Sequence, residues 1–135
     1  MRELTKRYLS LKKLIEKHYP ELIRSVTFIG GTELAPDKLR AHLKDNTFLD
    51  IWLSLDGDYS YHWEQRAKRG IIYRWDNAPD HSEIKSHPKH FHNKTDSEVK
   101  ASYLPSQPEE AIKEIFDFIR KNLGDRQVSK GTKTF

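Results

Sequence analysis

Apolar residues recur at two spacings along this chain, and the two spacings divide it into helices and strands. The first helix is predicted over residues 3–18, because apolar side chains recur there every three or four positions, at Leu4, Tyr8, Leu11 and Ile15. Pro20 ends this helix. Beyond Pro20 the spacing changes to alternation of apolar and polar residues, which predicts strands with one buried face.

Five segments carry the strand pattern. The first is rich in β-branched side chains and ends at Gly30-Gly31, where a loop begins. A helix beginning near Pro36 competes with a strand for the second segment. In chain order, the predicted strands are residues 22–29, 39–43, 47–55, 59–66 and 71–76.

The turn between residues 47–55 and 59–66 decides which side chains share a face. Asp56-Gly57 is a strong hairpin signal. A two-residue turn would, however, place the apolar residues of the two strands on opposite faces. We therefore expect a three-residue loop or a bulge at this point.

A polar cluster follows from the alternation in the last two predicted strands. Aligning their apolar faces pairs Trp63 with Tyr73 or a near neighbour. His62 then lies beside Arg74 on the polar face, with their Cβ atoms about 5 Å apart. A slip of one residue would invert this arrangement. The neighbouring positions on the polar face are Ser60 and Asp76.

A long loop and a final helix complete the predicted elements. Residues 77–105 have the composition of a loop, with a short strand as an alternative over 98–103, and a loop of this length is uncommon unless it is functional. Ser106 and Glu109 form a capping box that begins the helix, and Gly124 ends it. The apolar stripe of this helix consists of Ile112, Ile115, Phe116, Ile119 and Leu123.

These elements predict an α+β domain, in which a mostly antiparallel meander of about five strands is packed by N-terminal and C-terminal helices. Residues 1–124 form this single domain, and residues 125–135 are expected to be a flexible polar tail. The chain has no cysteine, which excludes disulfides and cysteine-based zinc sites. No apolar run has the length of a signal peptide or a membrane span, so we expect a cytoplasmic protein with no membrane partner.

His62 and Arg74 have side chains suited to phosphodiester cleavage. An imidazole titrates near neutral pH and serves as a general acid or base, and a guanidinium matches the oxygens of a phosphate. The structural alternative is that His62 bonds within the sheet while Arg74 pairs with Asp76. The formal net charge of +4 favours an anionic partner such as RNA, DNA or an acidic protein, although a solvated basic surface would give the same balance.

Four histidines crowd the segment after the last predicted strand: His81, His87, His90 and His92. The spacing of the last three is compatible with zinc or another divalent metal, but spacing within a loop fixes geometry poorly. Two other interpretations stay open. The histidines could transfer protons or contact phosphate near His62, or they could form a histidine-rich surface without a function.

Aromatic and basic side chains define a candidate RNA-binding surface. The aromatic residues of the fourth and fifth predicted strands are expected to pack in the core. Trp52 lies on the polar face of its strand and is better placed to stack on a base. The RNA-binding candidates are Trp52, Arg66, Lys68, Arg69 and Lys89.

This chain resembles the TumE family of prokaryotic toxin–antitoxin toxins in three segments taken together: YSYHW at 59–63, YRWDNAPDH at 73–81 and HPKHFH at 87–92. The resemblance covers residues 38–123. Asp80 stands where the family often has a histidine, which leaves His81 as the histidine of that motif.

The resemblance implies a type II toxin that acts as a ribonuclease on RNA and is encoded beside a helix-turn-helix antitoxin. We expect metal-independent cleavage by histidine acid–base chemistry. His62 would take the proton from the RNA 2′-hydroxyl, and His81 or His90 would protonate the leaving oxygen. Arg74 would stabilise charge on the phosphoryl group, and Asp76 would orient a histidine.

Two alternatives to this mechanism remain. One is a metal-dependent phosphodiesterase or other hydrolase that binds its metal through His87, His90 and His92. The other is a non-catalytic module that binds RNA or a protein.

Overall fold

The computed structural model describes residues 2–32 and 34–133. The chain divides into two compact units, Met1–Leu104 and Pro105–Phe135. The first unit holds two helices, one of them of four residues, and an antiparallel sheet, and the second holds one long helix. The prediction of a single domain over residues 1–124 stays a prediction.

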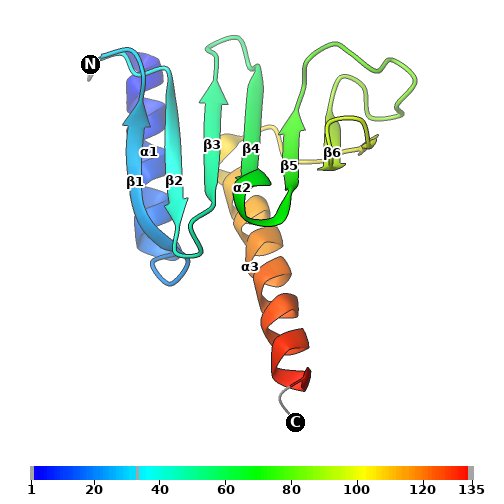
Figure 1. Cartoon of the computed structure of the whole chain (residues 1–135). Helices are drawn as coiled ribbons and strands as arrows, with labels where there is room; N and C mark the ends of the chain where they lie inside the picture. Colours follow the sequence, from blue (N-terminus) through cyan, green and yellow to red (C-terminus); the bar gives the residue numbers. More distant parts are fainter. Residues whose placement is uncertain (1, 33, 134–135) are drawn as a thin grey trace. The chain divides into compact units, whose positions relative to one another are not determined.

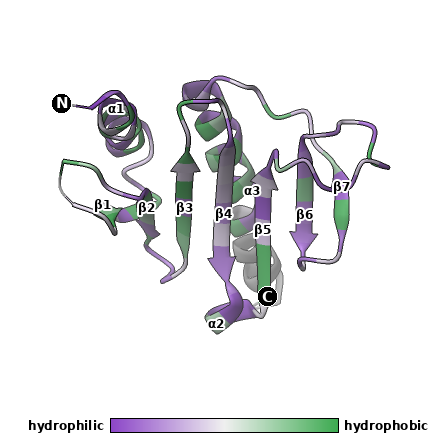
Figure 2. Cartoon of the chain, turned by 90° about the horizontal axis from the view of Figure 1, so that it is seen from above, coloured by the Kyte–Doolittle hydropathy of each residue, from purple (hydrophilic) through white to green (hydrophobic). Residues whose placement is uncertain are grey.

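The sheet is a meander in which each strand pairs antiparallel with its neighbour in the sequence (Figures 1 and 2). The α+β class and the meander are as predicted, but the sheet has seven strands in place of about five. The strands are β1 (Ile23–Ile29), β2 (Lys38–Leu43), β3 (Phe48–Leu53), β4 (Tyr59–Gln65), β5 (Ile71–Asp76), β6 (His90–Lys94) and β7 (Val99–Ala101). A four-residue helix, α2 (Arg66–Arg69), forms the basic turn between β4 and β5.

Helix α1 (Glu3–His18) has the predicted bounds and lies against β1 and β2. Its apolar stripe is buried, with Tyr8, Leu11 and Ile15 each 0% exposed. The Tyr8 hydroxyl accepts a hydrogen bond from the backbone N–H of Leu53 at 3.0 Å and donates one to the carbonyl of Asp37 at 3.1 Å. The polar end of this tyrosine therefore ties the helix to two segments of the first unit.

The predicted loop between β3 and β4 is confirmed. The backbone N–H of Ser54 donates to the carbonyl of Asp58 at 3.0 Å, and this hydrogen bond encloses a loop of three residues, 55–57. Gly57, the last of these three, has a φ of 94°, a conformation that favours glycine. The loop therefore keeps the apolar residues of both strands on one face, and the strand aromatics from Tyr59 to Trp75 are buried as predicted.

Strand β6 was not predicted, because His90 and His92 were interpreted as loop residues. Both imidazoles are buried on one side of the strand, so their alternation with Phe91 is a strand pattern in which the buried positions are polar. Hydrogen bonds satisfy these rings, which makes their burial tolerable. Strand β7 lies within the alternative strand predicted over 98–103.

The second unit consists of helix α3 (Pro108–Lys133). The helix begins at Pro108, two residues after Ser106 of the predicted capping box, and the Gln107 carbonyl accepts a hydrogen bond from the Ala111 N–H. The backbone also continues beyond Gly124, where the sequence predicted the end of the helix. Flexibility of residues 125–135 stays a prediction, and residues 134 and 135 lie outside the described part of the chain. The predicted stripe is buried at Ile112, Ile115, Phe116 and Ile119.

Neither long helix, as far as the chain is described, has the length and hydropathy that a membrane crossing requires.

Candidate active site

Polar side chains share one face of the sheet, and the strand register arranges them in two rows across it. Strand pairing aligns the first row from β2 to β6 as Arg40, Asp50, His62, Arg74 and His92. The second row runs from β3 to β6 as Trp52, Ser60, Asp76 and His90. The predicted pairing of His62 with Arg74, next to Ser60 and Asp76, is therefore confirmed.

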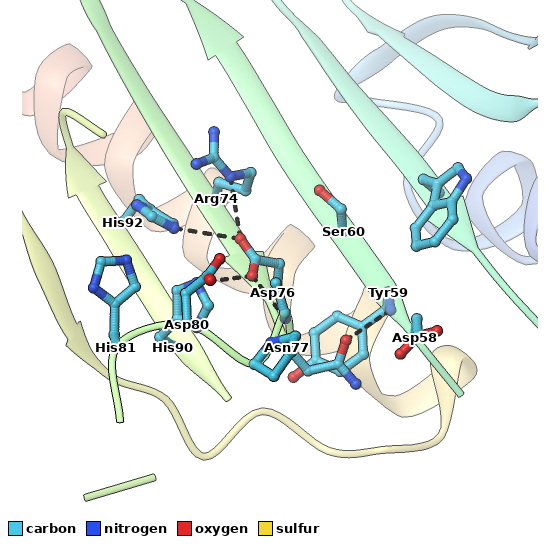
Figure 3. A pocket seen from close by; sticks show the side chains of 13 residues that line it. Asp58, Tyr59, Ser60, Arg74, Asp76, Asn77, Asp80, His81, His90 and His92 are labelled. Carbon is cyan, nitrogen blue, oxygen red and sulfur yellow. Dashed lines mark hydrogen bonds and ion pairs between the residues drawn. The ribbon is translucent and has the colours of Figure 1, made fainter. Parts of the chain in front are cut away.

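The Asp76 carboxylate is the centre of this face (Figure 3). Its Oδ1 lies 2.8 Å from Nε2 of His90, and its Oδ2 lies 3.3 Å from Nε2 of His92. Oδ2 also accepts a hydrogen bond from Nε of Arg74 at 3.2 Å. Oδ1 accepts one from the backbone N–H of Ala78 at 3.1 Å. A carboxylate, two imidazoles and a guanidinium thus meet at the end of β5.

Backbone carbonyls orient both imidazoles of β6. Nδ1 of His90 lies 3.0 Å from the carbonyl of Pro88, and Nδ1 of His92 lies 2.9 Å from the carbonyl of Asp96. Because a carbonyl oxygen only accepts, each ring carries a proton on Nδ1. Nε2 of each ring is therefore directed at Asp76.

Burial disfavours a charge on His92. The residue is 4% exposed, and burial lowers the pKa of its imidazole, with the neighbouring Arg74 acting in the same direction. Nη1 of Arg74 also pairs with Oδ1 of Asp96 at 2.8 Å. This hydrogen bond from Arg74 lowers the pKa of Asp96. Arg74 thus joins the carboxylate at the end of β5 to the loop that follows β6.

His62 lies on the other side of Arg74. Its Nδ1 is 3.5 Å from Nη1 of Arg74, and its Nε2 is 3.0 Å from Oε1 of Glu64. The pKa of Glu64 is lowered to about 2, mainly because the Arg66 guanidinium donates hydrogen bonds to its carboxylate. The hydrogen bond with His62 lowers this pKa to a smaller extent. His62 is thus held between a carboxylate that stays charged and a guanidinium.

Two pockets open over the polar face. The larger, about 590 Å³, contains the Asp76 cluster together with His81 and Asp80, and the smaller, about 390 Å³, contains His62 and Arg66. Trp52 and Ser60 line both pockets. The Trp52 side chain is exposed, so it is available to stack on a ligand that spans the two.

His81 lies over the β6 histidines in the larger pocket. Its ring centroid is 5.1 Å from that of His90 and 6.0 Å from that of His92. Nδ1 lies 3.5 Å from Oε1 of Glu83, and the side chain is 36% exposed. His81 is therefore the most accessible imidazole of this pocket.

Tyr59 and Asn77 line the same pocket. Asn77 accepts a hydrogen bond from the Tyr59 backbone N–H at 2.9 Å and donates one to the Gly57 carbonyl at 3.0 Å, which fixes the start of β4. The buried Tyr59 hydroxyl has no hydrogen-bond partner among the described residues. Burial, and then the charge of Asp76, raise the pKa of Tyr59 to about 12. This hydroxyl is therefore a buried donor at the wall of the pocket, without a partner in the described part of the chain.

The structure brings together four of the five predicted catalytic residues: Arg74, Asp76, His81 and His90 line one pocket. His62 contacts Arg74 but opens into the adjoining pocket. The predicted ligand His87 is exposed and lies outside the group of three that could hold a metal ion, which is Asp76, His90 and His92.

Two of the five predicted RNA-binding residues line the pockets, and the other three bond to groups elsewhere in the first unit. Trp52 and Arg66 line the pockets. Lys68 donates to the Asp45 carbonyl at 2.6 Å, and Arg69 pairs with the Asp45 carboxylate at 2.7 Å. Lys89 donates to the Leu104 carbonyl at 2.7 Å. RNA binding by all five stays a prediction.

Sequence reasoning missed the role of His92 beside Asp76, the Asp96 contact and the Tyr59 hydroxyl. The signal for His92 was present, because His90 and His92 are two positions apart and share a face if their segment is a strand. No local pattern indicated Asp96 or Tyr59, since both depend on how β4, β5 and β6 pair.

Residues 11–123 match a family model described as Toxin TumE. No curated protein and no solved structure matches the chain.

Proposed function

This chain belongs to the TumE toxin family, and from that premise we propose that it is the toxin of a type II toxin–antitoxin pair and cleaves RNA in the cytoplasm. Its proposed partners are RNA and a helix-turn-helix antitoxin encoded nearby. The observation that carries the proposal is the Arg74 guanidinium, which has a histidine on either side of it in an open polar surface.

Charge and shape support a phosphodiester substrate. A guanidinium recognises phosphate oxygens by paired hydrogen bonds, and Arg74 lies at the point where the two pockets adjoin. Lys38, Arg40 and Arg66 line the smaller pocket, where they would follow the sugar–phosphate backbone. Trp52, which borders both pockets, would stack on a base next to the scissile bond.

The proposed reaction is an internal transesterification of RNA. His62 takes the proton of the 2′-hydroxyl, whose oxygen attacks phosphorus. The bond from phosphorus to the 5′-oxygen breaks, and His81 protonates that oxygen. The products are a 2′,3′-cyclic phosphate and a 5′-hydroxyl. His81 suits the acid role better than His90, because His90 is 2% exposed and its Nε2 is directed at Asp76.

Arg74 and Asp76 support the two histidines. Arg74 would donate to the phosphoryl oxygens as negative charge develops on them. Asp76 holds Arg74 and both β6 imidazoles in place, so its role is to position other groups. This mechanism needs no cofactor, which agrees with the expectation from the sequence and stays untested.

The test compares wild type with His62→Ala in two assays. Expression of wild type without an antitoxin should arrest growth, and the purified protein should release RNA fragments with 2′,3′-cyclic phosphate ends. His62→Ala should slow cleavage by about 10²–10⁴-fold and relieve the arrest. His42→Ala is the matched control, because His42 belongs to β2 and bonds to Thr27 away from both pockets.

One outcome would overturn the ribonuclease, and another would overturn the assignment of His62 as the base. If wild type binds RNA without cleaving it, the protein is a binding module. If His62→Ala keeps its melting temperature and remains as active as wild type, His62 has a structural role and the proposed base is wrong.

A further inference from the structure

We propose that Asp76, His90 and His92 bind one divalent transition-metal cation in the larger pocket. This ligand set differs from the one considered from sequence, since Asp76 takes the place of His87. The inference deepens the proposed function and rests on it only for the role of the ion in cleavage. Binding itself rests on the geometry of three side chains.

The spacing of the three ligand groups fits a single ion. Asp76 oxygens lie 2.8 and 3.3 Å from Nε2 of His90 and His92, and one ligand atom from each residue falls within 4.8 Å of the others. Ligand atoms about 2.0–2.2 Å from one ion are about 3–3.6 Å apart in tetrahedral or octahedral geometry. Small side-chain adjustments would therefore bring all three to coordination distance.

Both histidines are already oriented as metal ligands are. A ligating imidazole usually donates its other ring N–H to a carbonyl or carboxylate, which fixes the ring and its tautomer. The Pro88 and Asp96 carbonyls accept from Nδ1 of His90 and His92. Arg74 and Ala78 hold the Asp76 carboxylate in the same way.

The three ligand groups already face one another. Nε2 of each ring is directed at the Asp76 carboxylate, whose Oδ2 also accepts from the Arg74 guanidinium. Asp76, His90 and His92 are 8%, 2% and 4% exposed, so a cation held among them would be largely shielded from water. A divalent cation bound by all three would replace the imidazole–carboxylate contacts with coordination.

The donor set selects among cations. Two imidazoles with one carboxylate suit zinc, manganese, iron, cobalt or nickel, whereas magnesium and calcium prefer oxygen ligands. Three protein ligands leave coordination positions open, and the cluster lines a pocket into which a phosphate oxygen could reach. The proposed ribonuclease does not require the ion, but a bound ion would add to the effect of Arg74 by polarising a phosphoryl oxygen beside it.

The first test measures binding directly. The full-length protein is stripped with a chelator and dialysed, then titrated in a calorimeter with zinc, manganese or magnesium alone. We expect one zinc or manganese per chain, no comparable magnesium binding, and a rise in melting temperature with the bound ion. Absence of stoichiometric zinc and manganese binding to folded wild type would overturn the proposal.

Variants then identify the ligands. His92→Ala and Asp76→Asn should each weaken binding by about 100-fold or more. His87→Ala, which removes an exposed histidine of the same segment, should bind like wild type. Loss of binding in His87→Ala with retention in His92→Ala would overturn the assignment. Circular dichroism checks that each variant is folded, and the wild-type titration decides the question if Asp76→Asn is not.

Failure of this inference is distinguishable from failure of the ribonuclease. RNA cleavage by stripped protein in EDTA, together with no zinc or manganese binding in the titration, would retain the proposed function and exclude the metal site. Stoichiometric binding that requires His92, without any RNA cleavage, would establish the metal site and exclude the ribonuclease.

Discussion

His62 of β4 and Arg74 of β5 are paired on adjacent strands, with Nδ1 of the imidazole 3.5 Å from Nη1 of the guanidinium. The same guanidinium contacts Asp76 at 3.2 Å and Asp96 at 2.8 Å. One side chain therefore connects the histidine of the smaller pocket to the carboxylate cluster of the larger one. A residue with a single donor nitrogen could not keep all three contacts.

The first prediction concerns this geometry. Arg74→Lys keeps the charge but loses the planar donor fork, so the rate of RNA cleavage should fall by about 10²–10³-fold. The fold should persist, because Arg74 lies on the polar face. Single-turnover cleavage and a urea melt on the same sample check both parts. Cleavage at the wild-type rate would show that only the charge of Arg74 matters.

The second prediction concerns the Tyr59 hydroxyl. Tyr59→Phe removes a buried donor without a partner among the described residues, so the free energy of unfolding should change by less than about 1 kcal/mol. Activity should fall if that donor serves a ligand in the pocket. Unfolding and cleavage are measured together. A large loss of stability with unchanged cleavage would assign the hydroxyl a purely structural role.

The third prediction concerns acid stability through Asp50. Burial opposes ionisation of this carboxylate, but hydrogen bonds from Arg40 and Lys38 outweigh burial and lower its pKa. The folded state then binds fewer protons than the unfolded chain, so Asp50 stabilises the fold above the unfolded pKa of about 3.9. That stability is lost as pH falls through the folded pKa.

Asp50→Asn should therefore lower the free energy of unfolding at pH 7 by about 1–3 kcal/mol. The difference from wild type should shrink as pH falls from about 5 to 2. Urea melts over this range provide the measurement, and Asp56→Asn in the exposed loop is the control. A difference that stays constant with pH would contradict the linkage.

The fourth prediction concerns a buried position of α3. Ile115 is 1% exposed, so Ile115→Ala should leave a cavity and cost about 2–5 kcal/mol in a urea melt. Lys121→Ala, at an exposed position of the same helix, should cost less than about 0.5 kcal/mol. Equal effects of the two substitutions would contradict the burial of Ile115.

The sequence was informative where alternation was regular. Strands β3, β4 and β5 place apolar side chains at every second position, so their faces, their register and the pairing of His62 with Arg74 could all be predicted. Strand β6 could not be recognised by apolar alternation, because its buried positions are histidines. Their burial depends on Asp76 and on two backbone carbonyls, which only the folded sheet brings near.

Candidate residues were easier to predict than their roles. Arg74, Asp76, His81 and His90 do line one pocket. Asp76 was assigned to orient one histidine, whereas it contacts two. The sequence could not reveal this, since the second contact requires β6 to pair with β5 in the observed register.

The meander also determines when the pocket assembles during folding. Each strand pairs with its neighbour in the chain, so most pairings close short loops and should form quickly. The longest connection between paired strands, residues 77–89, joins β5 to β6. Closing it brings His90 and His92 to Asp76, so we expect β2 to β5 to be in place before the histidines arrive. Pulsed hydrogen exchange should then protect β4 amides earlier than β6 amides, and a newly made chain would hold a folded sheet before it holds a working site.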